Sequence, residues 1–143
     1  MTKKFSPELH EKYDFFGRGI VKRFFADTWK LVAEDNPDQY GIDLVIYKKG
    51  IPVGYAEVEV RTNWKSLNFP FEELNVPKRK MKLFMRDNDL PSLFFSVNCY
   101  GTALLYCSTD LVMKSRLENS PSKYMDYEEF FKVPVERMTF AVL

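Results

Sequence analysis

Histidine is almost absent from this chain of 143 residues, which contains one, His10. Sites built on several histidines are therefore excluded, among them two-histidine zinc hydrolases, two-histidine iron centres and C2H2 zinc fingers. A Ser-His or Cys-His nucleophile pair would have to use His10 itself. That residue lies in a polar segment beside Glu8 and Glu11, far from any Gly-x-Ser-x-Gly motif. Any chemistry must therefore depend on other side chains.

Cysteine and long apolar segments are also scarce. Cys99 and Cys107 stand eight residues apart without a Cys-x-x-Cys motif, which favours buried, reduced thiols over a zinc knuckle or a redox pair. No apolar segment follows Met1-Thr2-Lys3-Lys4, and no apolar run approaches the roughly 20 residues that span a bilayer. We therefore expect a soluble, cytoplasmic protein without a membrane partner.

Aromatic residues, by contrast, are abundant, with 13 Phe and 8 Tyr. A chain of this length buries roughly two-thirds of its unfolded surface, so it needs neither disulfides nor a structural metal. The sequence therefore predicts a single domain over residues 1–143 with an aromatic-rich core, and argues against disorder.

The net charge of +1 is a sum over segments of opposite sign. Residues 27–43 carry a net charge of −4, residues 44–60 are neutral, and residues 61–86 carry +5. An acidic and a basic stretch therefore flank one neutral segment. A site that binds both a metal and a polyanion needs such an arrangement, although alternating charge on a solvated surface is its ordinary explanation.

Periodicity and turn signals predict the order of elements. A helix is expected over residues 6–26, starting at Ser6-Pro7-Glu8, and a tight turn at Lys49-Gly50 joins two strands into a hairpin. Further strands, a loop or short helix over 109–124, and two further helices complete an α/β fold with a central sheet of four to five strands and helices on each side. The expected strands are 29–33, 42–48, 51–62, 93–98, 102–108 and 137–143, and the two further helices are 77–87 and 126–132.

The most informative segment is Glu57-Val58-Glu59-Val60-Arg61. Side chains alternate along a strand, so the two glutamates and the arginine share one face while the valines share the other. Asp43 begins the preceding strand, and an antiparallel hairpin brings it close to the glutamates. An Asp and one or two Glu on adjacent strands form an all-oxygen pocket of the kind that Mg²⁺ or Mn²⁺ prefers.

At this point the sequence resembles a family. Gly41-Ile42-Asp43-Leu44-Val45, a hairpin turn and then Glu57-Val58-Glu59-Val60-Arg61 are similar to the signature of the PD-(D/E)XK nuclease superfamily, which includes restriction endonucleases, phage endonucleases and junction resolvases. The resemblance covers roughly residues 12–108, and its specific part is confined to residues 41–61. It implies a mixed central sheet flanked by helices, a metal held by Asp43 and an acid of the next strand, and a lysine near the attacking water.

Two registers of the family motif fit, and both depart from it. If Glu59-Val60-Arg61 is the acid-x-Lys triplet, Arg61 replaces the lysine and can stabilise a phosphate but cannot act as a base. If Glu57-Val58-Glu59 is the triplet, an acid replaces the lysine and the cation must come from elsewhere. Relatives with a lysine displaced onto the next helix make Lys78 and Lys80 candidates. The second register is slightly favoured, because it leaves Glu59 as an additional ligand.

A basic and aromatic region follows the motif. The basic side chains could contact phosphates on either side of the scissile bond, giving affinity without base specificity, although a solvated amphipathic helix explains them equally well. Trp64, Phe69 and Phe71 could stack on exposed bases, but anchoring of a loop in the core is the better expectation. The expected nucleic-acid contacts are Lys65, Lys78, Arg79 and Lys82.

These observations predict a nuclease that acts on DNA with Mg²⁺ or Mn²⁺. Asp43, Glu57 and Glu59 are expected to hold the metal, which activates a water, while Arg61, Lys78 or Lys80 stabilises the transition-state charge. Cleavage of branched or double-stranded DNA needs two active sites, which is consistent with a homodimer. The main alternative is a nuclease-fold module without catalysis that binds nucleic acid or protein. A carboxylate-based glycosidase is a third interpretation, and the sequence supports it less well.

Overall fold

The computed structural model describes residues 7–121 and 127–143, with side chains described from residue 11 onward. Within that part, six strands form one mixed sheet, in which β3 and β5 are parallel and all other neighbours are antiparallel. The α/β class expected from the sequence is confirmed, but the sheet is larger than the four to five strands predicted. In spatial order its strands are β1 (Val32–Asp35), β2 (Leu44–Lys48), β3 (Ile51–Arg61), β5 (Ser92–Asn98), β6 (Ala103–Ser108) and β9 (Thr139–Val142).

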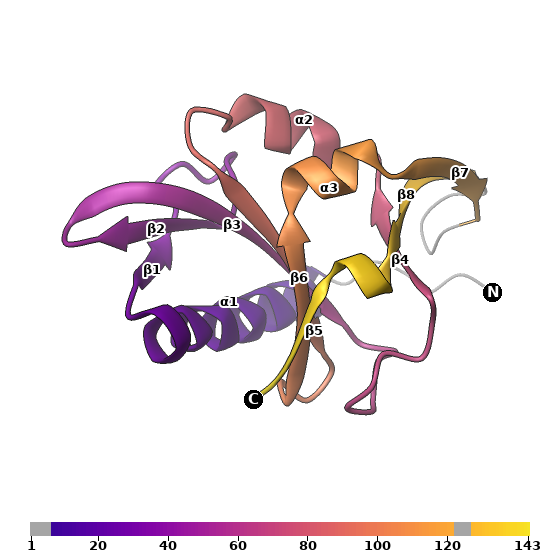
Figure 1. Ribbon diagram of the computed structural model, residues 1–143, viewed down its shortest axis with the longest axis horizontal. Helices are drawn as coiled ribbons and strands as arrows, with labels where there is room; N and C mark the ends of the chain where they lie inside the picture. Colours follow the sequence, from indigo (N-terminus) through magenta and orange to yellow (C-terminus); the bar gives the residue numbers. More distant parts are fainter. Residues whose placement is uncertain (1–6, 122–126) are drawn as a thin grey trace.

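A smaller antiparallel sheet and the helices complete the fold (Figure 1). One long helix lies on one face of the large sheet, and two short helices lie on the other face together with the small sheet. None of the helices in the described part of the chain is long and apolar enough to cross a membrane. The small sheet is ordered β4 (Glu73–Pro77), β8 (Glu128–Pro134), β7 (Arg116–Ser120), and the helices are α1 (Pro7–Trp29), α2 (Lys80–Arg86), α3 (Thr109–Lys114) and the 3-10 turn η1 (Val135–Arg137).

The hairpin between β2 and β3 forms as the sequence predicts. Lys49 and Gly50 both have positive φ, 52° and 79°, as a two-residue turn of this kind requires. Gly101, at φ 69°, likewise turns the chain between β5 and β6. These turns set the registers of β2 with β3 and of β5 with β6, and in the parallel β3–β5 pair Glu57 lies opposite Phe94.

Helix α1 is longer than expected, and the first strand starts later. The helix continues to Trp29, whose ring packs edge-on against Phe24, Phe25 and Tyr106, and the strand expected at 29–33 instead runs from Val32 to Asp35. Aromatic packing therefore carries the helix beyond the predicted end at residue 26.

Other boundaries are corrected by the small sheet. The helix predicted at 126–132 is wrong: Glu128–Pro134 is a strand, and residue 126 lies outside the described residues. Pro77 does not start a helix but ends β4, so α2 begins at Lys80 and residue 78 precedes it. The segment 109–124 contains α3 and also strand β7. The long connections between the sheets thus form a second sheet that local sequence patterns did not indicate.

Candidate active site

The candidate site lies where β2 and β3 stop pairing. The last pair in that ladder is Leu44 with Ala56, and beyond it side chains replace the main-chain partners. The Asp43 main-chain N–H donates to Glu57 Oε1 at 3.2 Å, while Asp43 Oδ2 accepts from the Val58 N–H at 2.9 Å. Each acid therefore binds a main-chain donor of the other strand, and the predicted proximity of Asp43 and Glu57 is confirmed.

Lys80 completes this pair of acids. It is the first residue of α2, and its Nζ lies 2.7 Å from Glu57 Oε2. The helix is anchored by Phe84, which is fully buried and packs edge-on against Phe94, the residue beside Glu57 on the neighbouring strand. Packing in the core therefore positions the ammonium group over the carboxylate.

Burial gives Glu57 unusual acid–base properties. Its side chain is 5% exposed, and this desolvation, with the negative charge of Asp43, raises the pKa of Glu57 to about 7 although Lys80 opposes the shift. Burial by itself would lower the pKa of Lys80, but the carboxylates of Glu57, Glu59 and Asp43 raise it above its ordinary value. Lys80 is therefore a permanent cation at neutral pH.

Glu59 and Arg61 share the face of Glu57, as strand alternation predicts, but they form a separate pair. Glu59 Oε1 accepts from Arg61 Nε at 2.7 Å and from Ser96 Oγ at 3.2 Å. The Arg61 guanidinium also donates to the main-chain carbonyl of Asn75 on β4. The carboxylate of Glu59 is thus held by Arg61 and Ser96.

The donor set suits a hard cation held by two protein carboxylates. Mg²⁺ is commonly bound through one or two carboxylates together with substrate phosphate oxygens. Asp43 lines a cavity of about 230 Å³, whereas Glu57 is buried and forms no part of its wall. The described residues contain no group of three or more His, Cys, Asp or Glu side chains placed to hold a metal, so a cation at this position would have two carboxylates from the chain, those of Asp43 and Glu57.

The loop that delivers Asp43 is tightly constrained. The Ile42 N–H donates to Asp87 Oδ2 at 2.8 Å, and the Ile42 carbonyl accepts from Asn36 Nδ2 at 2.9 Å. A Cβ atom at Gly41 would come within 2.6 Å of Asn36 Nδ2 and 2.8 Å of Asp87 Oδ2. A side chain at position 41 would therefore displace Asn36 or Asp87 from Ile42, and the contacts of these two residues position Asp43 just before β2.

The predicted phosphate-binding side chains divide into two groups. Lys78 pairs with Glu129 Oε1 at 3.3 Å and Arg79 pairs with Glu128, both on β8. Lys65 and Lys82 are exposed, and among the described residues neither forms an ion pair. Lys65 and Lys82 are thus exposed cations, whereas Lys78 and Arg79 form ion pairs with the small sheet.

Three further residues shape the site, and sequence reasoning missed two of them, Asp87 and Asn75. Asp87 holds the loop before Asp43, Ser96 binds Glu59, and the Asn75 carbonyl holds Arg61. Ser96 could be found from its place in an apolar strand on the site's face. Asp87 and Asn75 gave no signal, since their contacts span 45 and 14 residues and depend on tertiary structure.

No protein-family model, curated protein sequence or solved structure matches this chain. The geometry of Asp43, Glu57 and Lys80 therefore has to be interpreted by its chemistry.

Proposed function

We propose that this protein is a metal-dependent DNA endonuclease that hydrolyses phosphodiester bonds with Mg²⁺ or Mn²⁺, on a restriction-endonuclease-like fold. The observation that supports this most is the 2.7 Å contact between Lys80 Nζ and Glu57 Oε2, beside Asp43. Glu57-Val58-Glu59 lacks the lysine of an acid-x-Lys motif, and α2 supplies a lysine at the carboxylate. The contact therefore favours the register in which Glu57 is the motif acid.

The side chains have distinct roles in this proposal. Asp43 and Glu57 would hold the divalent cation, which when bound neutralises charge on a phosphodiester and lowers the pKa of water. Lys80 donates to Glu57 Oε2, so it would orient that carboxylate and place a positive charge beside the phosphate. Arg61 lies farther along β3, where it is paired with Glu59. Glu59 positions Arg61. To serve as a third metal ligand, Glu59 would have to leave its ion pair with Arg61.

The direct test is nicking of supercoiled plasmid DNA. We expect cleavage with Mg²⁺ or Mn²⁺, none with EDTA, and a loss of about a hundredfold or more in Asp43→Asn and Glu57→Gln. Glu118→Gln is the matched control, because Glu118 is an exposed acid on β7 that pairs with Arg116. Cleavage that persists in EDTA, or that survives both substitutions, contradicts the proposal.

One observation favours the alternative of a nuclease-fold binding module without catalysis. The carboxylates of Glu57 and Glu59 already have partners within the chain, Lys80 for one and Arg61 with Ser96 for the other. If these contacts are permanent, the site holds no cation. Titration with Mn²⁺ by calorimetry separates the two functions: binding that Asp43→Asn abolishes supports the endonuclease, and no binding at millimolar Mn²⁺ supports the module.

A further inference from the structure

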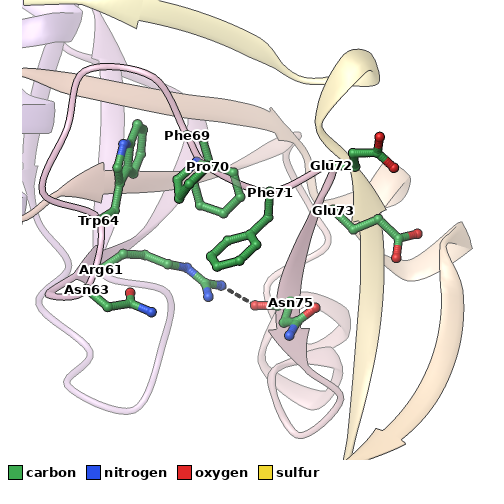
Figure 2. Close-up of a pocket in the computed structure, with 9 residues that line it drawn as sticks. All are labelled: Arg61, Asn63, Trp64, Phe69, Pro70, Phe71, Glu72, Glu73 and Asn75. Carbon is green, nitrogen blue, oxygen red and sulfur yellow. Dashed lines mark hydrogen bonds between the residues drawn. The ribbon is translucent and has the colours of Figure 1, made fainter.

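A larger cavity lies where β3 ends, next to the candidate active site (Figure 2). Its volume is about 610 Å³, within the range of sites that enclose a small organic group. Arg61 forms part of its wall and also binds Glu59, so the cavity and the row of charged side chains on β3 share a residue. The residues on which its chemistry depends are Arg61, Asn63, Trp64, Phe69, Phe71 and Asn75.

The aromatic wall of this cavity is anchored at one end and exposed at the other. Trp64 is 1% exposed, and its indole N–H donates to the Asn68 carbonyl at 3.1 Å. Phe69 packs edge-on against Trp64 at 5.2 Å, and Phe71 packs edge-on against Phe69 at 5.7 Å. Phe71 is nevertheless 62% exposed. A supported but uncovered ring can accept a planar group at little cost in side-chain ordering.

The polar groups of the cavity favour an uncharged, planar ligand. The side-chain amides of Asn63 and Asn75 each provide donors and an acceptor. Arg61 already donates to Glu59 and to the Asn75 carbonyl, so its charge is largely compensated. Glu72 and Glu73 lie at the outer end with carboxylates that point away from the rings, and they disfavour a phosphate there (Figure 2). In a DNA strand, the group with these properties is the base.

We propose that this cavity holds one unpaired nucleobase of the DNA substrate, stacked on Phe71 and bound at its edge by Asn63 and Asn75. The inference rests on the proposed function, and it names the substrate class as DNA with an unpaired nucleotide near the cleaved bond. Glu57 and Arg61 are four residues apart on β3, roughly 13 Å, which is a few nucleotides along a strand. A paired base is stacked inside the duplex and must be extruded first, so an unpaired base is the favoured occupant.

The test measures binding in EDTA, where no cleavage occurs. Fluorescence anisotropy compares a labelled duplex with the same duplex carrying one unpaired thymidine. We expect the protein to bind the second DNA more tightly, and Phe71→Ala to weaken that binding about tenfold while leaving duplex binding unchanged. Phe71→Trp should keep the preference and gain indole quenching when the DNA with the unpaired base binds.

The matched control is Phe15→Ala. Phe15 is an exposed phenylalanine of α1, 72% exposed, on the helix that covers the other face of the sheet. We expect it to bind both DNAs like the wild type. Equal binding of the two DNAs by the wild type, binding of neither, or a preference that Phe71→Ala leaves intact overturns the inference. Thermal melting of each variant checks that the fold is retained.

Cleavage of the same DNAs with Mg²⁺ separates this inference from the proposed function. Cleavage without a Phe71-dependent preference keeps the endonuclease and rejects the base pocket. A Phe71-dependent preference without cleavage keeps the pocket and rejects the endonuclease.

Discussion

The two faces of the β3–β5 strand pair carry opposite kinds of side chain. On one face Val58, Phe95 and Val97 are buried against α1, and Gly17 lets that helix approach until a Cβ atom there would lie 2.8 Å from Val60. On the other face lie Glu57, Glu59 and Ser96. Lys80 forms an ion pair with Glu57, and Arg61 and Ser96 both donate to Glu59. The α1 face of the pair is therefore apolar, whereas the other face combines the buried ring of Phe94 with ionisable groups at fixed positions.

The difference shows how a strand can carry charge next to a core. Every buried side-chain polar atom among the described residues has a hydrogen-bond partner, so the charged face is not a defect in packing. The Glu57 carboxylate accepts from groups outside the strand pair, the Asp43 main-chain N–H and the Lys80 ammonium, whereas the Glu59 carboxylate accepts from Arg61 and Ser96 within the pair. The site thus depends on elements that the α1 face does not use, and the two faces should respond differently to substitution.

The largest effect is expected on the apolar face. Phe95→Ala removes a fully buried ring that contacts Phe24, Phe25 and Tyr106 at centroid distances of 5.2–5.9 Å. We expect it to lower the free energy of unfolding by about 3–5 kcal/mol. Cleavage per folded molecule should stay near the wild-type value.

Urea unfolding measures this loss, and Phe15→Ala on the exposed surface of α1 is the control, with an expected change below about 0.5 kcal/mol. A fall in cleavage per folded molecule after Phe95→Ala contradicts the separation of the two faces.

A smaller loss is expected from breaking the ion pair on the charged face. Lys80→Met leaves Glu57 buried without its cation, and we expect a loss of about 3 kcal/mol in metal-free protein well above pH 7, where the Glu57 carboxyl of the wild type is ionised. Lys82→Met is the control, because Lys82 is exposed on the same helix. The double variant Glu57→Gln with Lys80→Met should recover most of the loss, since it removes both charges. Urea unfolding in EDTA checks all three, and a double variant no more stable than Lys80→Met argues against the pair.

The same variants have a predicted pH dependence. The pKa of Glu57 is about 7 in the folded protein and 4.5 in the reference state, so the folded form binds the proton more tightly. The free energy of unfolding should therefore fall as pH rises from about 4.5 to 7. Without Lys80 the pKa of Glu57 is higher still, so the fall should extend above pH 7 in Lys80→Met. It should be absent when Glu57→Gln is added.

Local patterns were enough to predict the hairpin of β2 and β3 and the charged face of β3. Alternation places Glu57 and Glu59 together, and the Lys49-Gly50 turn fixes the register that brings Asp43 near them. Lys80 was one of two lysines considered for the missing cation, and the structure brings it, and not Lys78, to Glu57. These predictions succeed because each depends on residues close in sequence or on one hairpin.

Longer-range features could not be predicted in this way. The segment 126–132 has apolar residues that satisfy a helical pattern, yet Phe131 and Val133 are buried at strand spacing because β4 and β7 pair on either side. That small sheet also pairs with Lys78 and Arg79 through Glu129 and Glu128, in ion pairs that a phosphate would have to displace. Pairing with distant strands thus determined both the secondary structure of this segment and the ion-pair partners of Lys78 and Arg79.

The smallest effect concerns a thiol in the same row as Glu57. Across the sheet, Glu57 pairs with Phe94 and Phe94 pairs with Cys107, so the carboxylate and the thiol are two strands apart on the charged face. Burial raises the pKa of Cys107 to about 12, whereas Cys99 is half-buried after β5. At about pH 8 only roughly one Cys107 in ten thousand is a thiolate. We expect Ellman's reagent to label Cys99 in the native protein and Cys107 only after unfolding, with Cys99→Ser and Cys107→Ser assigning the two signals. Native labelling of Cys107 at the rate of Cys99 would mean that water reaches the charged face as far as β6. The polar groups of that face would then be solvated, and not only those at the end of the β2–β3 ladder.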